Sequence, residues 1–179
     1  MSNNRSTKKK HYLDTCIFIG YLNQEENKFS ECNAVISAAS EGFIEAFTSE
    51  LIGVELIKLN GFPSGAENAM NQFLDDFINK SHWLKLISFE REMARIARFL
   101  RQKYKLKPFD AMHLATAIRH GVDYFDTTDE DYWNGETKKG KLPKSVGYVD
   151  YEPVIIQRPK VEGYTIPIPF SNEIIPGLE

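Results

Sequence analysis

Residues 108–129 read PFDAMHLATAIRHGVDYFDTTD. The first half of this stretch has apolar residues at helical spacing and ends before a glycine, so it predicts a helix over 108–119. The stretch 123–126 then has the pattern of a short strand. One acid, Asp110, lies at the entrance of the helix, and a second acid, Asp129, follows the strand. The stretch therefore predicts a helix followed by a strand, with one carboxylate at the start of the helix and another just after the strand.

The same alternation extends outward in both directions. Further strands are expected at 11–13, 43–48, 83–87 and 145–149, and further helices at 16–22, 29–40, 50–59, 66–78 and 89–104. Strands that alternate with helices predict an α/β fold with a mostly parallel sheet and helices on both of its faces.

Four carboxylates occupy comparable junctions in this predicted fold: Asp14, Glu55, Asp110 and Asp129. In parallel α/β sheets the functional crevice lies beyond the carboxyl ends of the strands, so folding should bring these side chains together. Clustered negative charges are unfavourable unless a cation compensates them. Hard divalent ions such as Mg²⁺ prefer oxygen ligands of this kind, and the pattern therefore predicts an acidic metal site.

Each acid also has a structural interpretation. Asp14 and Asp110 could cap a helix or complement its dipole. Asp129 could belong to a polar turn, and Glu55 could face solvent, although its neighbours in 51–57 are mostly apolar. His113 is interpreted as a packed helix residue rather than as a ligand or base.

Composition bounds the possible partners. The chain has 179 residues, a net charge of −3 and a pI of about 5.9, so it has no overall basic character for nucleic acid. A local basic rim stays possible, and a group of lysines after Asp129 could form it or could be a solvated loop: Lys138, Lys139 and Lys141.

The cysteines and termini indicate a reduced compartment. Cys16 and Cys32 form no zinc-like or redox-like pair, so both are interpreted as reduced apolar residues. Residues 1–10 predict a polar, disordered leader with no signal region after it. No apolar run is long enough to span a bilayer, and a cytoplasmic protein is expected.

The last part of the chain differs in composition. Residues 151–179 contain several prolines, which rule out a long helix, yet they remain rich in isoleucine. A disordered tail would be more polar. We therefore expect one α/β domain over 1–150, followed by an extended arm at 151–179 that lies on its own domain or on a neighbouring subunit.

Other catalytic patterns are absent from the sequence. It contains no HExxH zinc motif, no glycine-rich phosphate loop and no GxSxG nucleophile elbow. The four acids are therefore the strongest chemical signal in the chain.

Four segments together resemble the successive motifs of PIN domains, most closely those of VapC-type toxins: 12–19, 48–56, 109–117 and 124–132. This resemblance implies a three-layer α/β/α sandwich and a ribonuclease that depends on Mg²⁺ or Mn²⁺. It places the acidic quartet of the family at Asp14, Glu55, Asp110 and Asp129. It also assigns Thr127 as the hydroxyl residue that precedes the last acid.

The resulting hypothesis is a metal-dependent endoribonuclease that hydrolyses single-stranded or looped RNA as the toxin of a toxin–antitoxin pair. An antitoxin protein and a second copy of the chain, in a homodimer, are its expected partners. The alternative is a protein-binding module with an idle or weak metal site. A DNA nuclease with the same acids is a third possibility.

Overall fold

A six-stranded sheet forms the centre of the molecule. The computed structural model describes residues 8–132 and 142–166, and within them the strand order is β3-β2-β1-β4-β6-β5. All neighbouring pairs are parallel except β5 and β6, which are antiparallel. The strands are β1 (Lys10–Leu13), β2 (Glu45–Ser49), β3 (Leu84–Ile87), β4 (Tyr124–Asp126), β5 (Ser145–Tyr148) and β6 (Tyr151–Gln157).

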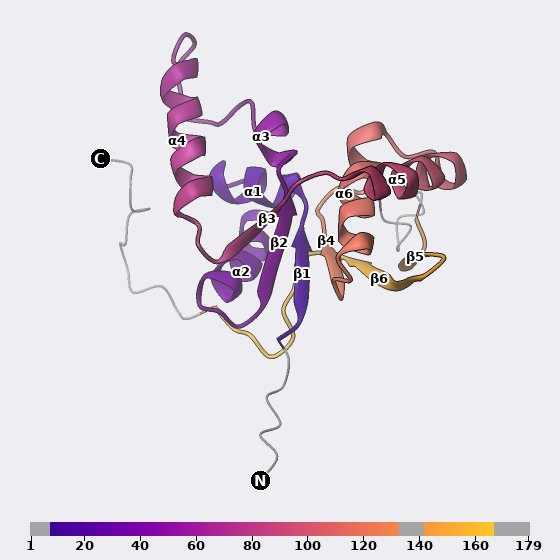
Figure 1. The fold of residues 1–179 in the computed structure, drawn as a ribbon. Helices are drawn as coiled ribbons and strands as arrows, with labels where there is room; N and C mark the ends of the chain where they lie inside the picture. The colour runs from indigo at the N-terminus through magenta and orange to yellow at the C-terminus, as the bar shows by residue number, and fades with distance from the viewer. Residues whose placement is uncertain (1–7, 133–141, 167–179) are drawn as a thin grey trace.

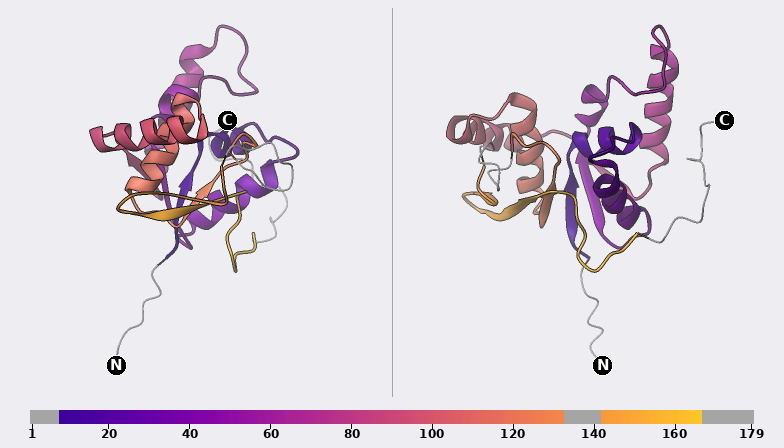
Figure 2. Two further views of the ribbon diagram at one scale, coloured as in Figure 1. Left: turned by 90° about the vertical axis from the view of Figure 1, so that its right-hand side faces the viewer. Right: turned by 180° about the vertical axis from the view of Figure 1, so that it is seen from behind.

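Helices cover both faces of this sheet, as Figures 1 and 2 show. They are α1 (Thr15–Leu22), α2 (Phe29–Ser40), α3 (Ile52–Glu55), α4 (Glu67–Lys80), α5 (Arg91–Tyr104) and α6 (Pro108–Arg119). Side chains of α1 to α4 form one apolar core against the sheet. Side chains of α5 and α6 form the other, to which β4, β5 and β6 contribute together with Tyr12 of β1 and Ile87 of β3. The predicted mostly parallel α/β sandwich is confirmed.

Alternation along β1 explains how one strand serves both cores. Tyr12 faces the α5–α6 core, whereas Leu13 faces the α1–α4 core, because successive side chains of a strand point to opposite faces. Both side chains are fully buried. β1 lies between β2 and β4 inside the sheet, and its burial on both faces fixes the position of the residue that follows it, Asp14.

Strand register brings the ends of β1 and β4 together. Leu13 pairs with Asp126 in the parallel ladder, so the next residues along each strand, Asp14 and Thr127, emerge at the same edge. The backbone N–H of Asp14 donates to the carbonyl of Asp126 at 3.1 Å. The parallel sheet therefore gathers residues from both strand ends at one edge, as predicted.

The helix predicted over 50–59 is wrong in extent. Only one turn, Ile52–Glu55, is helical, and the chain then leaves the helix at Leu56, where φ is −78° and ψ is 74°. Leu56 and Leu59 are both buried, whereas Ile57 between them is 73% exposed. The turn away from helical geometry lets both leucines reach the core, and it leaves Glu55 at the end of the helix.

The arm predicted from residue 151 differs from the structure in its first part. Residues 151–157 form β6, which lies between β4 and β5 inside the sheet, so the predicted domain boundary at 150 cuts through the fold. The strand predicted at 145–149 is confirmed as β5, which lies at the edge of the sheet and is followed in the chain by β6. Residues 158–166 then run on the α2 side of their own domain, where Arg158 pairs with Glu31 at 2.9 Å.

Some predictions fall outside the described residues. They concern most of the leader, the lysines at 138, 139 and 141, and the part of the arm beyond residue 166. Among the residues that are described, no helix is both long enough and apolar enough to cross a membrane.

Candidate active site

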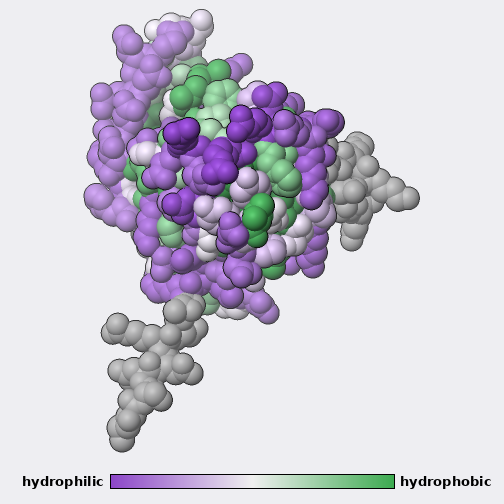
Figure 3. Space-filling view, turned by 45° about the vertical axis from the view of Figure 1, so that its right-hand side comes forward, coloured by the Kyte–Doolittle hydropathy of each residue, from purple (hydrophilic) through white to green (hydrophobic). Residues whose placement is uncertain are grey.

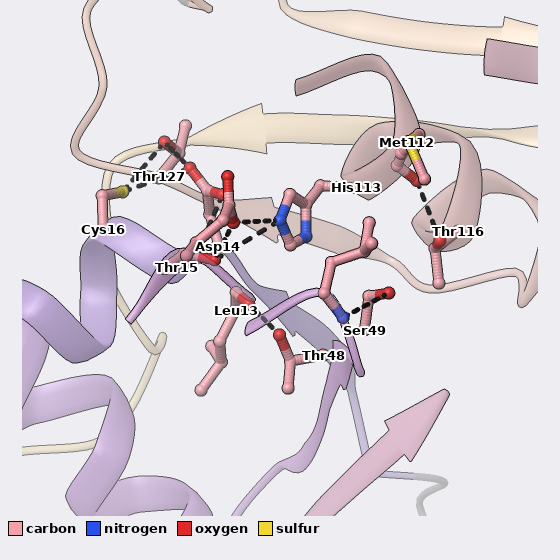
Figure 4. Close-up of polar contacts among 12 residues, drawn as sticks. Leu13, Asp14, Thr15, Cys16, Thr48, Ser49, Met112, His113, Thr116 and Thr127 are labelled. Carbon is pink, nitrogen blue, oxygen red and sulfur yellow. Dashed lines mark hydrogen bonds and ion pairs between the residues drawn. The ribbon is translucent and has the colours of Figure 1, made fainter. Parts of the chain in front are cut away.

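Asp14 lies at the centre of a network of hydrogen bonds (Figure 4). Its Oδ1 accepts a bond from the backbone N–H of Thr15 at 2.9 Å, so the carboxylate caps α1, as its structural interpretation predicted. Its Oδ2 accepts from the Thr127 hydroxyl at 2.7 Å and from the Cys16 thiol at 3.2 Å. Asp14 is only 6% exposed. Asp14 therefore caps α1 with one oxygen and takes part in the hydrogen-bond network of the site with the other.

Burial raises the pKa of the Asp14 carboxyl, and the charge of Glu55 adds to this effect. The positive charge of His113 and the hydrogen bonds from Thr127 and Cys16 act in the opposite direction. Burial and Asp14 also hold the pKa of the Cys16 thiol well above its usual value. Cys16 is therefore a protonated donor to Asp14 rather than a nucleophile.

Glu55 reaches the site through a chain of buried donors. Its Oε2 accepts a bond from Nε2 of His113 at 2.6 Å and another from the hydroxyl of Thr15. Because a carboxylate only accepts hydrogen bonds, the His113 proton at this contact must be on Nε2. All hydrogen bonds of Glu55 within the described chain go to Oε2, so they leave Oε1 available for another partner.

His113 is held from the other side by Tyr12. Its Nδ1 lies 2.7 Å from the Tyr12 hydroxyl, and its side chain is 1% exposed. Burial lowers the pKa of His113, but the hydrogen bond to Glu55 and the charges of Asp14, Glu55 and Asp110 outweigh it and raise the pKa overall. For Glu55, burial favours a higher pKa, but the bonds from His113 and Thr15 dominate and lower it. These opposite shifts both favour the charged form of the pair.

Asp110 occupies the first turn of α6, after Pro108 at the helix start. Its Oδ2 is buried and has no hydrogen-bond partner among the described residues. Burial raises the pKa of this carboxyl, and the negative charges of Asp14, Asp129 and Glu55 raise it further, while Lys107 acts in the opposite direction. An unpaired buried carboxylate oxygen is costly, and a cation would compensate it.

Asp129 follows β4 in a polar turn. Its Oδ1 accepts the backbone N–H of Asp131 at 2.8 Å, and its own N–H donates to the Thr127 hydroxyl at 3.0 Å. Thr127 therefore links Asp14 to Asp129 through a single oxygen. The structural interpretation of Asp129 as a turn residue is correct, and the turn holds the residue beside the other acids.

The four acids influence one another, yet they do not form a closed cage of ligands. Asp14, Asp129 and Glu55 all raise the pKa of Asp110 through their charge. No three His, Cys, Asp or Glu side chains within 8–132 and 142–166 are grouped so that they could hold one metal ion. The unpaired Asp110 oxygen fits a cation, and the role of the quartet as ligands stays a prediction.

His113 is the site residue that the sequence interpretation did not include. It was expected only to pack, and it does pack, but it also binds Glu55. One signal was available, because His113 follows Asp110 by three residues and therefore shares a helix face with it. The contact itself joins residues that are 58 positions apart, which no helical pattern predicts.

The PIN domain family model matches residues 11–134, which is more than half of the chain. The chain belongs to the PIN domain family. The matched region carries all four acids and Thr127, and it includes every helix that the structure describes. The resemblance inferred from the motifs is therefore confirmed for the family, and PIN domains are generally nucleases that use divalent metals.

Solved structures with the same fold include toxin–antitoxin complexes. One is a toxin–antitoxin complex from Klebsiella pneumoniae, with a TM-score of 0.50 and 23% identity over 72% of this chain and 93% of that chain. Another is VapBC2 from Rickettsia felis bound to a DNA fragment from its promoter, with a TM-score of 0.54 and 15% identity over 83% and 98%. The search of curated proteins found no match. Because both sequence identities are below 25%, the likeness to these two structures shows a shared fold and nothing more.

Proposed function

We propose that this PIN domain is a divalent-metal-dependent endoribonuclease that cuts single-stranded or looped RNA. The observation that carries the proposal is Asp110, whose buried Oδ2 has no partner among the described residues and whose pKa is raised by burial and by three other acids. A carboxylate in this environment favours binding of a cation, and Mg²⁺ or Mn²⁺ suits an all-oxygen donor set.

Asp14 and Asp110 would hold the ion most directly, with Glu55 and Asp129 binding it directly or through water. When bound, a divalent ion lowers the pKa of a water molecule and stabilises negative charge on phosphate oxygens. The surrounding residues orient the acids: Thr127 holds Asp14, and His113 and Thr15 hold Glu55. Such outer hydrogen bonds tune metal affinity in other metal sites.

Hydrolysis would proceed by in-line attack of water on the phosphorus, which leaves a 5′-phosphate and a 3′-hydroxyl. A covalent enzyme intermediate would require an activated nucleophile. Cys16, the thiol beside Asp14, is held protonated by its raised pKa. The chemistry of the site therefore favours direct attack by water.

Toxin activity within a toxin–antitoxin pair is the proposed biological role. It is supported by family membership and by the fold shared with toxin–antitoxin complexes. The proposed partners are an antitoxin protein and a second copy of the chain, and the proposed location is the cytoplasm, where RNA substrates are present. Induced expression of the protein alone should then arrest growth, and co-expression of its antitoxin should restore it.

Cleavage assays on matched oligonucleotides test the enzyme proposal. Labelled single-stranded RNA and DNA of one sequence would be incubated with the protein in Mg²⁺, in Mn²⁺ or in excess chelator. We expect cleavage of RNA that requires the metal, with little or no cleavage of DNA. Equal cleavage of DNA would contradict the RNA assignment, and cleavage in chelator would contradict the metal dependence.

Metal binding can be measured separately from cleavage. Saturation at 100 times the dissociation constant stabilises a protein by about 2.7 kcal/mol, which for a domain of this size corresponds to roughly 5–10 °C in melting temperature. We expect Mn²⁺ to raise the melting temperature of the wild-type protein by this order, and KCl at equal ionic strength serves as a control for general ionic effects. No shift with Mn²⁺ or Mg²⁺ would favour the protein-binding module with an idle site, which the open arrangement of the acids also allows.

A further inference from the structure

A groove lies between α5 and α6, on the opposite side of α6 from the acids. It encloses about 720 Å³ and is lined by Phe89, Ala94, Ala97, Arg98, Arg101, Gln102, Lys105, Leu106, Pro108 and Met112. We call it the α5–α6 groove. Its lining contains three cationic side chains and no acidic one, in a protein whose net charge is −3. The groove is therefore locally positive, although the net charge of the chain is negative.

The cations follow one line along the helix and its end. Arg98, Arg101 and Lys105 are spaced by three and four residues, which places them on the same side. None of the three is in an ion pair within the described part of the chain, whereas Arg95 of the same helix binds Glu92 at 2.9 Å. Lys105 ends α5 in a left-handed conformation, with φ of 60°, which directs the chain toward α6.

Apolar side chains complete the groove. Phe89 and Met112 are partly buried, and both pack against the core between the sheet and α5–α6. In Figure 3, which brings this side of the molecule forward, apolar surface appears between hydrophilic side chains rather than as one continuous patch. Cations beside an aromatic ring, that of Phe89, suit a ligand that has both phosphates and planar bases.

The groove and the acidic site share the N-terminal turn of α6. Pro108 and Met112 line the groove, and Asp110 lies between them in sequence but on the opposite face of the helix. The two sites are therefore separated by about the width of a helix, 10–12 Å. Phe109, in the same first turn of α6, is 41% exposed.

We propose that the α5–α6 groove binds the RNA strand next to the phosphate that is cut. Arg98, Arg101 and Lys105 contact phosphates, and Phe89 and Met112 contact bases. The inference rests on the proposed ribonuclease function, because an acidic crevice repels a phosphodiester and the substrate must gain its attraction nearby. Lys107, the basic residue nearest to Asp110 in sequence, is already paired with Asp131 at 3.1 Å. A second copy that used the same groove across a two-fold axis would bring like charges together.

The test measures RNA binding without cleavage. In an Asp110→Asn background, anisotropy titrations would compare the intact groove with the triple variant Arg98→Ala/Arg101→Ala/Lys105→Ala. The matched control, Arg91→Ala/Arg95→Ala/Lys103→Ala, removes the same charge from the same helix but outside the groove. We expect the groove variant to bind single-stranded RNA at least about 10-fold more weakly. The slope of log K against log salt concentration should become less steep by about 2, because three phosphate contacts are lost. The control should change binding by less than about 3-fold.

In an otherwise wild-type protein the groove variant should raise KM for RNA with little change in kcat, because the groove is remote from the reacting phosphate. Equal weakening of RNA binding by both triple variants would overturn the proposal, because the effect would then come from the total positive charge of the helix and not from the groove. Unchanged RNA binding, together with lost binding of the antitoxin or lost self-association in sedimentation, would overturn it in favour of a protein interface. If the wild-type protein did not cleave RNA but its binding depended on the groove, the groove assignment would hold and the ribonuclease proposal would fail.

Discussion

Replacing Asp110 with Asn is expected to lower the rate of RNA cleavage by at least about 10²-fold, the order of effect seen when one stabilising group is removed from a catalytic site. The substitution keeps the size of the side chain and removes its charge. Because Asp110 is the acid with an unpaired buried oxygen, the loss should appear in kcat and in Mn²⁺ affinity together. Cleavage kinetics and a Mn²⁺ titration of the same variant measure both.

The same substitution should change stability in opposite directions with and without metal. In chelator, Asp110→Asn should raise the melting temperature, because it removes a charge that burial and Asp14, Asp129 and Glu55 all disfavour. In saturating Mn²⁺ the wild-type protein should be the more stable of the two, because only it retains the binding energy of the ion. This reversal distinguishes loss of a metal site from damage to the fold.

The pH dependence follows from the direction of the Asp110 shift. Its pKa is higher in the folded state than in the unfolded state, so protonation stabilises the fold at low pH and that contribution is lost as pH rises through the folded pKa. Asp110→Asn should remove this part of the pH dependence in chelator. Glu130→Gln, which changes an exposed acid in the same region, is the control and should leave cleavage and stability nearly unchanged.

The periodic elements of the fold could be predicted from the sequence. The helices at 29–40 and 108–119 were predicted with the bounds that the structure shows, because in both a continuous apolar stripe is followed by a glycine. Alignment of the strand ends followed from parallel topology alone, and it placed Asp14, Thr127 and Asp129 at one edge. Local sequence patterns were therefore sufficient to predict features that depend on a single helix or strand.

Prolines misled the prediction at β6. Pro153 lies within this strand, and proline cannot donate a hydrogen bond to a neighbouring strand. The strand tolerates it because the pairing of β5 with β6 is irregular between Val146 and Tyr148. Gly147 lies there, and a side chain at that position would meet Pro153 at 3.4 Å. This accommodation depends on two strands at once, so the composition of 151–179 alone could not show it.

The role of His113 also depends on a tertiary contact, and replacing this residue is expected to have the second large effect on cleavage. His113→Leu should lower kcat by about 10–100-fold, the range for a residue that orients a metal ligand. Leucine cannot donate to Glu55, so the carboxylate keeps only its bond from Thr15, and the Tyr12 hydroxyl loses its bond with Nδ1. A buried polar group left unpaired costs about 1–3 kcal/mol, so the melting temperature should also fall.

A conservative variant separates orientation from packing. His113→Gln keeps an N–H donor in the same region and should recover most of the Mn²⁺ affinity that His113→Leu loses. A purely structural role would instead make Mn²⁺ affinity the same in both folded variants. His120→Gln, at the exposed end of the same helix, should behave as the wild-type protein in cleavage and metal binding.

Stability as a function of pH gives an independent measurement of the His113–Glu55 pair. The pKa of His113 is raised by folding, so its contribution is fully present below about pH 6.5 and is lost as pH rises through the higher folded value. The pKa of Glu55 is lowered, so its contribution is present above about pH 4.3 and is lost as pH falls through the lower folded value. The free energy of unfolding, measured by denaturant titration in chelator, should therefore decline above pH 6.5 more steeply in the wild-type protein than in His113→Gln. Parallel curves for the two proteins would show that the charge of His113 contributes nothing to the stability of the fold.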